Sequence, residues 1–138
     1  MRFFLDTNVL FDLYEEERPS HKDSFLLVKQ GLMGQVTLVV TVASVMTMLY
    51  SLQRYKVPRE LIIGRLNMIL PHLDIAQVNA PELIAGINSD WNDIEDAIQF
   101  HAAMASGGID AIVSNDKDFA QQKRVPVLTP KQALKRVK

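Results

Sequence analysis

Short apolar segments alternate along the chain with longer segments whose apolar residues recur at helical spacing. The short segments predict strands buried on both faces, because they lack regular alternation with polar residues. They are, in chain order, Arg2 to Leu5, Val36 to Val40, Leu73 to Val78, Ala111 to Val113 and Val127 to Leu128. With a helix between successive strands, this order predicts an α/β fold: a three-layer sandwich with a central parallel sheet of about five strands.

Residues that start and stop helices mark the ends of the predicted helices. The expected helices are Asn8 to Tyr14, Ser20 to about Leu32, Ala43 to Arg54, Arg59 to Leu70, Pro81 to Ile87, Asn92 or Asp93 to Ser106, and one that begins after Thr129. Thr129 suits an N-cap and Pro130 the first helical position. With 138 residues, 48% of them hydrophobic, the chain suffices for one core, and we expect a single domain over residues 1–138.

One uncharged stretch, Gln30 to Gln53, is long enough to span a bilayer. Glycine, serine and threonine interrupt it, and a β-branched run, Val36 to Val42, gives way to a helix-like run, Ser44 to Leu52. Two buried elements explain this pattern better than a membrane span. The apolar start before Asp6 is too short for a secretory signal, and there is no cysteine. We therefore expect a cytoplasmic protein with no membrane contact.

Charge is distributed unevenly along the chain, although the formal net charge is only -1. Residues 1–116 hold 15 acids and 8 Lys or Arg, whereas residues 117–138 hold 7 Lys or Arg and one acid, Asp118. The basic tail either supplies phosphate contacts for a nucleic acid or forms a solvated helix whose cations are favoured near its C-terminal end. The sequence leaves both interpretations open.

Acidic side chains stand where ligands bind in parallel sheets. Asp6 and Asp116 each follow a predicted strand, and ligands bind beyond the carboxyl ends of strands where the strand order switches. Asp93, Glu95 and Asp96 lie in the first turn of a predicted helix, whose positive end favours negative charge. If the two strands are neighbours at the switch, the carboxylates of Asp6 and Asp116 meet in one crevice, and the helix acids are a third set that could join them.

Converging carboxylates raise one another's pKa unless a cation lies between them. Hard ions such as Mg²⁺ or Mn²⁺ prefer oxygen ligands, and they assist hydrolysis of phosphodiesters. Each acid also has an ordinary structural explanation: Asp6 as an N-cap, Asp96 as a partner of its helix dipole and Asp116 as a turn former. Their combined placement, rather than any one of them, indicates the metal site.

Four segments resemble the PIN-domain family, and the likeness runs from Phe3 to about Pro130. They are residues 4–10 (FLDTNVL), 93–99 (DIEDAIQ), 112–119 (IVSNDKDF) and 125–130 (VPVLTP), the last being similar to one subgroup. The resemblance implies a Mg²⁺- or Mn²⁺-dependent endoribonuclease, similar to the toxins of bacterial toxin–antitoxin pairs. Such toxins commonly form homodimers and are inhibited by an antitoxin protein.

The matching segments also imply which residues form the site. The expected set is Asp6, Asp96 and Asp116 as catalytic acids and metal ligands, Asp93 as a further metal-site residue that orders water or a second ion, and Asn8, Ser114, Asp118 and Thr47 as supporting residues. Asn8 and Ser114 are expected to orient the acids.

One residue departs from the family pattern. The family usually carries a glutamate on the helix after the second strand, where this chain has Thr47, and no acid occurs between Asp23 and Glu60. Either Asp93, Glu95 or Asp118 completes the site and nuclease activity is retained or weakened, or the protein is a degenerate PIN-like module that binds RNA or a protein with weak or no catalysis. We favour the first. A fold that binds phosphorylated small molecules is disfavoured, because no glycine-rich strand-to-helix turn is present.

Overall fold

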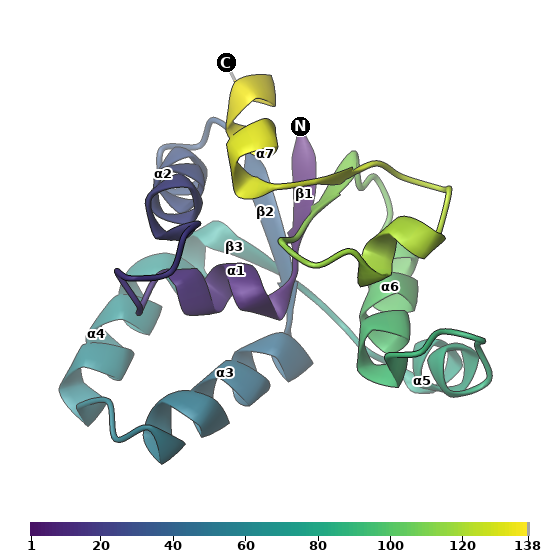
Figure 1. Ribbon diagram of the computed structural model, residues 1–138, viewed down its shortest axis with the longest axis horizontal. Coiled ribbons are helices and arrows are strands. Elements are labelled where there is room, and N and C mark those ends of the chain that lie inside the picture. The colour runs from purple at the N-terminus through teal and green to yellow at the C-terminus, as the bar shows by residue number, and fades with distance from the viewer. Residues whose placement is uncertain (138) are drawn as a thin grey trace.

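The computed structural model describes residues 1–137, which form a five-stranded parallel sheet flanked by helices (Figure 1). The sheet order is β3-β2-β1-β4-β5. The strands are β1 (Arg2–Leu5), β2 (Thr37–Thr41), β3 (Leu73–Ala76), β4 (Ala111–Val113) and β5 (Val127–Leu128). The helices are α1 (Thr7–Asp12), α2 (His21–Leu32), α3 (Val42–Arg54), α4 (Arg59–Ile69), α5 (Ala80–Ile87), α6 (Ile94–Ser106) and α7 (Pro130–Arg136). The predicted α/β class and parallel sheet are confirmed.

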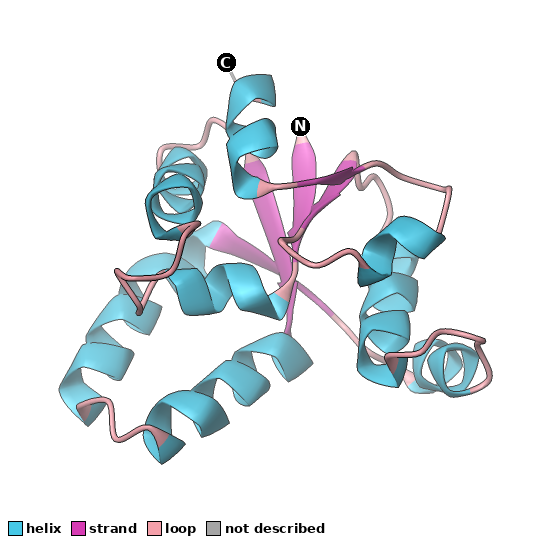
Figure 2. Ribbon diagram, in the orientation of Figure 1, coloured by secondary structure: helices cyan, strands magenta, loops and turns pink. Residues whose placement is uncertain are grey.

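Apolar side chains of the strands point alternately to two cores, one on each face of the sheet. Phe3 and Leu5 of β1 pack in the core beneath α1, α2, α3, α4 and α7, whereas Phe4 packs in the core beneath α6. Figure 2 shows the same division, with the strands between a larger group of helices and the pair formed by α5 and α6. Burial on both faces explains the apolar runs in the sequence.

The order of the strands switches at β1. The chain passes from β1 to β2 and β3 on one side, and β4 then pairs with β1 on the other side. Leu5 pairs with Val113 in this register, and the backbone N–H of Asp6 donates to the carbonyl oxygen of Val113 at 3.0 Å. The residues that follow β1 and β4 are therefore neighbours, which is the condition for Asp6 and Asp116 to share one crevice.

Several element ends differ slightly from those predicted. β3 ends at Ala76 rather than Val78, and it is an edge strand on which Asp74 and Ile75 are exposed; Asp74 pairs with Arg2. A 3₁₀ turn, Leu70–His72, follows α4, because Pro71 has no backbone N–H to continue an α-helix. A second one, Asp118–Gln121, follows the turn after β4.

The uncharged stretch of the sequence forms the end of α2, then β2 and most of α3, so it is not one span. The strand β2 is buried, as predicted, whereas α3 buries one face through Ser44, Met48 and Leu52 and exposes the other. None of the helices within residues 1–137 combines the length and the hydropathy needed to cross a membrane. At the C-terminal end, Thr129 caps α7, and Lys135 and Arg136 lie in its last turn, where the helix dipole favours cations.

Candidate metal centre

Asp6 is held by hydrogen bonds on both of its carboxylate oxygens. It follows β1 and is the N-cap of α1, where its Oδ1 accepts from the backbone N–H of Thr7 at 2.7 Å. Its Oδ2 accepts from the hydroxyl of Ser114 at 2.7 Å and from the side-chain amide of Asn8 at 2.9 Å. Asp6 is only 6% exposed, so its position is fixed by the fold before any ligand binds.

Asp116 lies beside Asp6 because Ser114 joins the two segments. The Ser114 hydroxyl donates to Asp6 and accepts from the backbone N–H of Asp116 at 2.9 Å. The Oδ1 atom of Asp116 accepts from the backbone N–H of Asp118 at 3.0 Å, which is the turn-forming role considered above. Asp116 therefore acts as a turn former, as its ordinary structural explanation predicted. This role uses only Oδ1 and leaves Oδ2 free to bind a ligand.

The first turn of α6 supplies the remaining acids. Asp93 is the N-cap, and its Oδ1 accepts from the backbone N–H of Asp96 at 3.0 Å. Together with Asp6 and Asp116, residues Asp93, Glu95 and Asp96 line one open cavity of about 240 Å³, whose other lining residues are Thr7, Asn8, Phe11 and Thr47. The structure thus brings the four predicted metal ligands around one space. In Figure 1, α1 and α3 meet at this end of the sheet.

Burial and mutual repulsion raise the pKa values of two aspartates at the cavity. The pKa of Asp6 is raised to about 6, chiefly by burial and also by the charges of Asp116 and Asp93, although hydrogen bonds from Ser114 and Thr7 lower it. Burial and the charges of four other aspartates raise the pKa of Asp96 to about 8. No lysine or arginine is among the described residues that line the cavity. The carboxylates therefore repel one another without a counter-charge.

The donor set fits a hard divalent ion. One carboxylate oxygen from each of Asp93, Asp96 and Asp118 lies within 4.8 Å of the others. Opposite oxygens around an octahedral Mg²⁺ are about 4.2 Å apart, given metal–oxygen distances of about 2.1 Å. The three oxygens are therefore spaced about as closely as ligands of one such ion. Asp118 contributes to this cluster without lining the cavity that Asp6 and Thr47 share.

A buried polar network next to the cavity was not predicted from the sequence. Asp12 is 1% exposed, and its carboxylate accepts from Arg18 Nε at 2.7 Å, Ser24 Oγ at 2.5 Å and Asn115 Nδ2 at 3.2 Å. Arg18 also donates to the backbone oxygen of Asn8 at 3.4 Å. The network therefore ties the start of α2 to residues beside Asp6 and Asp116.

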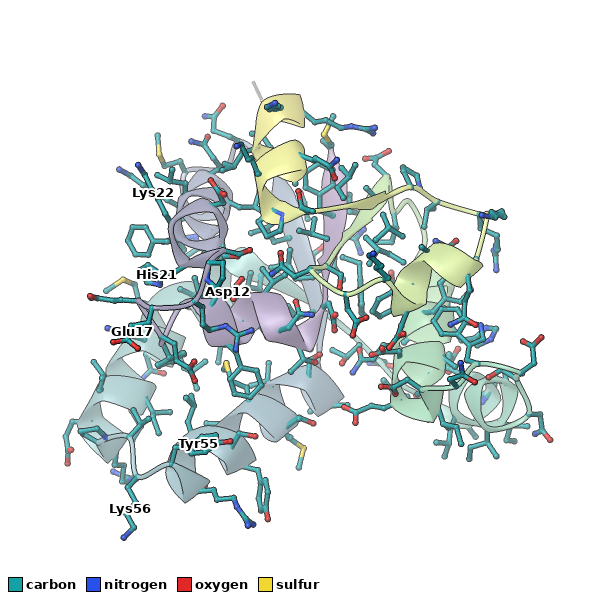
Figure 3. The ribbon with its side chains drawn as sticks, in the orientation of Figure 1. Asp12, Glu17, His21, Lys22, Tyr55 and Lys56 are labelled. Atoms are coloured by element: carbon teal, nitrogen blue, oxygen red, sulfur yellow. The ribbon has the colours of Figure 1, made fainter. Side chains whose placement is uncertain are left out.

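The sequence held one signal for this network: Asp12 lies three residues after Val9, on the face of the helix that is otherwise apolar. Figure 3 labels Asp12 and His21, which lie close together where α1 and α2 approach each other. The ring Nδ1 of His21 is 2.5 Å from the backbone oxygen of Asp12. An acid on an apolar helix face predicts a buried partner, but the partner's identity is not readable from spacing.

Comparison with known proteins gives consistent results. A PIN-domain family model matches residues 2–118. The ribonuclease VapC1 of Aquifex aeolicus (strain VF5) is 29% identical over 124 residues, which cover 86% of this chain and 83% of that protein.

Solved structures share the fold at lower identity. VapC20 of Mycobacterium tuberculosis, a sarcin-ricin loop cleaving toxin, has a TM-score of 0.66 at 17% identity and covers 86% of this chain and 93% of its own. VapBC2 of Rickettsia felis, bound to a promoter DNA fragment, has a TM-score of 0.64 at 17% identity over 94% of this chain and 98% of its own. A toxin–antitoxin complex from Klebsiella pneumoniae has a TM-score of 0.61 at 21% identity, and the match covers 92% of this chain and 96% of the chain in that complex.

Proposed function

The chain belongs to the PIN-domain family, and from this premise and its acidic cavity we propose that it is a metal-dependent endoribonuclease, the toxin of a toxin–antitoxin pair. The observation that carries the proposal is the convergence of Asp6, Asp93, Asp96 and Asp116 on one cavity, with raised pKa values at Asp6 and Asp96. The ribonuclease relative from Aquifex aeolicus supports RNA as the substrate.

The acids would hold Mg²⁺ or Mn²⁺, with Asp6, Asp96 and Asp116 as ligands and Asp93 as a ligand of the ion or of its water. When bound, the ion supplies charge neutralisation and an activated water for phosphodiester hydrolysis. Ser114 and Asn8 hold the Asp6 carboxylate in one orientation through their hydrogen bonds to Oδ2. Asp93 uses one oxygen to cap α6 and keeps the other for the site. The site is thus preorganised by three elements of the fold.

Cleavage of a short single-stranded RNA by the purified protein in Mn²⁺ tests the proposal. We expect the wild type to cleave, and Asp6→Asn and Asp116→Asn to lose at least about 100-fold in rate, because each removes a charged ligand. Asp90→Asn, which removes an exposed acid outside the cavity, is the matched control and should cleave as the wild type does. A folded wild type that cleaves no RNA in Mg²⁺ or Mn²⁺ contradicts the proposal.

One observation favours a second candidate, a non-catalytic module that binds RNA or a protein. Thr47 lines the cavity where the family usually has a glutamate, and a hydroxyl adds no charge. On this alternative, the wild type binds RNA without cleaving it, and Asp6→Asn leaves RNA binding unchanged. A gel-shift assay beside the cleavage assay separates the two candidates.

We assign the partner protein to an apolar cavity on the other side of the sheet from α6. This partner groove, of about 640 Å³, lies between α2 and α4 and is lined by Leu13, Tyr14, Glu16, His21, Phe25, Val28, Lys29, Leu32, Arg65, Met68 and Ile69. Phe25 is 54% exposed and Met68 64%, which is typical of a surface that another protein covers. Similar folds occur in solved toxin–antitoxin complexes, which supports such a partner.

The proposal includes a homodimer in the cytoplasm. Val42, Met46 and Tyr50 are exposed at four-residue intervals along α3 and form an apolar stripe on one helix face. We assign this stripe to a second copy of the chain. Light scattering should give twice the mass of the 15.6 kDa chain, and Met46→Glu should reduce it to one copy. An unchanged mass for Met46→Glu contradicts the placement of the interface.

A further inference from the structure

The α3 side of the metal centre contributes no carboxylate. α3 contains no acidic residue between Val42 and Arg54, and two hydroxyls at its start are already engaged. Thr41 Oγ1 donates to Gln99 Oε1 at 2.8 Å, and the Ser44 hydroxyl lies 2.6 Å from that of Thr7. Thr47 is the α3 residue that lines the cavity. A cation in the cavity would therefore meet neutral groups on this side unless another element supplied a charge.

Glu95 reaches this side of the cavity from α6. Its Oε1 lies 3.5 Å from Thr47 Oγ1, and both residues line the cavity together with the four aspartates. A contact of this length is at the outer limit of a hydrogen bond, so it places the carboxylate near α3 but leaves its capacity to bind a ligand almost wholly free. None of the ion pairs found in residues 1–137 includes Glu95. Glu95 is exposed, so its carboxylate lies at the open edge of the cavity and is accessible to a ligand there.

A role at the helix start alone does not account for this placement. An acid in the first turn of a helix is favoured by the helix dipole wherever its side chain points. The capping hydrogen bond of α6 is made by Asp93, whose Oδ1 accepts from Asp96. Glu95 instead extends across to a residue 48 positions away in the sequence. The Glu95 carboxylate therefore extends along the cavity toward the part of it that Thr47 lines.

We propose that Glu95 is a ligand of the bound Mg²⁺ or Mn²⁺ and replaces, from α6, the α3 glutamate that is absent at Thr47. The inference rests on the proposed metal-dependent function. Glutamate is one methylene longer than aspartate, so it can span from α6 to the α3 side, whereas Asp93 and Asp96 remain at the α6 side. Asp118 does not line the cavity that Thr47 and Glu95 share, so it does not fill this position.

Mn²⁺ binding measured by calorimetry on the full chain tests the inference without reliance on activity. We expect Glu95→Gln to weaken Mn²⁺ binding by at least about tenfold, because the isosteric amide removes the charge. Adding Thr47→Glu to Glu95→Gln should restore the affinity to within about threefold of wild type, because a carboxylate then returns to the α3 side. Glu60→Gln, which changes an exposed glutamate on α4, is the matched control and should bind as the wild type does.

The possible failures are distinguishable. If Glu95→Gln binds Mn²⁺ like the wild type while Asp6→Asn loses it, Glu95 is not a ligand, and the proposed function stands. If the double variant Thr47→Glu, Glu95→Gln binds Mn²⁺ as weakly as Glu95→Gln alone, the proposal that Glu95 replaces an α3 glutamate is overturned. If the wild type itself binds no Mn²⁺, the proposed function is overturned together with the inference. Thermal melts in EDTA verify that each variant is folded.

Discussion

The hydroxyl of Ser114 lies 2.7 Å from the Oδ2 atom of Asp6, although 108 positions separate the two residues in sequence. This hydrogen bond joins the end of β4 to the end of β1 at the point where the strand order switches. It also lowers the pKa of Asp6 against the larger effect of burial. A single hydroxyl thus both positions a proposed metal ligand and favours its charged form.

Removal of this hydroxyl should shift the pH dependence of metal binding. Ser114→Ala leaves the Asp6 carboxylate with one donor fewer on Oδ2, so its pKa rises above about 6. A divalent ion must then displace a more tightly bound proton, and we expect Mn²⁺ affinity at pH 6 to fall by about tenfold. The loss should shrink towards pH 8. Calorimetry at both pH values checks this, with Ser114→Thr as the control that keeps the hydroxyl; an equal loss at both values refutes it.

The metal-free protein should become less stable as the pH rises. The pKa values of Asp6 and Asp96 are raised from 3.8 to about 6 and about 8, so the folded state binds protons more tightly than the unfolded chain over this interval. Stability from these groups is therefore present at low pH and is lost as the pH passes through the folded values. Asp96→Asn should flatten this dependence and raise the melting temperature at pH 8. Melting curves in EDTA from pH 5 to pH 8 provide the measurement, and a wild-type melting temperature that rises over this range would contradict it.

Loss of Arg18 should destabilise the network beside the site. Arg18→Ala removes the charged donor to Asp12 and leaves a buried carboxylate with only Ser24 and Asn115 as donors. We expect the free energy of unfolding to fall by about 1–3 kcal/mol. Asp12→Asn in the Arg18→Ala background should recover part of the loss, because the unpaired charge is removed. Urea denaturation of the two variants and the double variant checks the coupling, and strict additivity would show that the pair does not interact.

A charge in the partner groove should block the partner without affecting the active site. Phe25→Glu places a carboxylate in the groove between α2 and α4, where binding would have to desolvate it. We expect at least about a tenfold loss of affinity for the protein encoded by an adjacent reading frame, with RNA cleavage unchanged. Ile87→Glu alters an equally exposed residue on α5 and should bind the partner normally. Co-purification of the two proteins measures the effect, and capture of Phe25→Glu at wild-type level would exclude the groove.

The sequence by itself determined the order of strands and helices. A buried parallel strand requires a continuous apolar run and a helix requires apolar residues at helical spacing, and both patterns are formed by residues close together in the sequence. It also determined that Asp6 and Asp116 follow strands and that Asp93 starts a helix. Local signals were weakest at element ends: β3 stops at Ala76, because its neighbour β2 ends at Thr41, the residue paired with Ala76, and α3 begins at the next residue.

Only the tertiary structure decided which of these residues meet. The pairing of β1 with β4 places Ser114 beside Asp6, and the packing of α6 brings Glu95 to Thr47. The raised pKa values of Asp6 and Asp96 and the burial of Asp12 beneath Arg18 follow from the same packing. Charge interactions and metal ligation depend on distance in space, which a pattern of neighbouring residues does not contain.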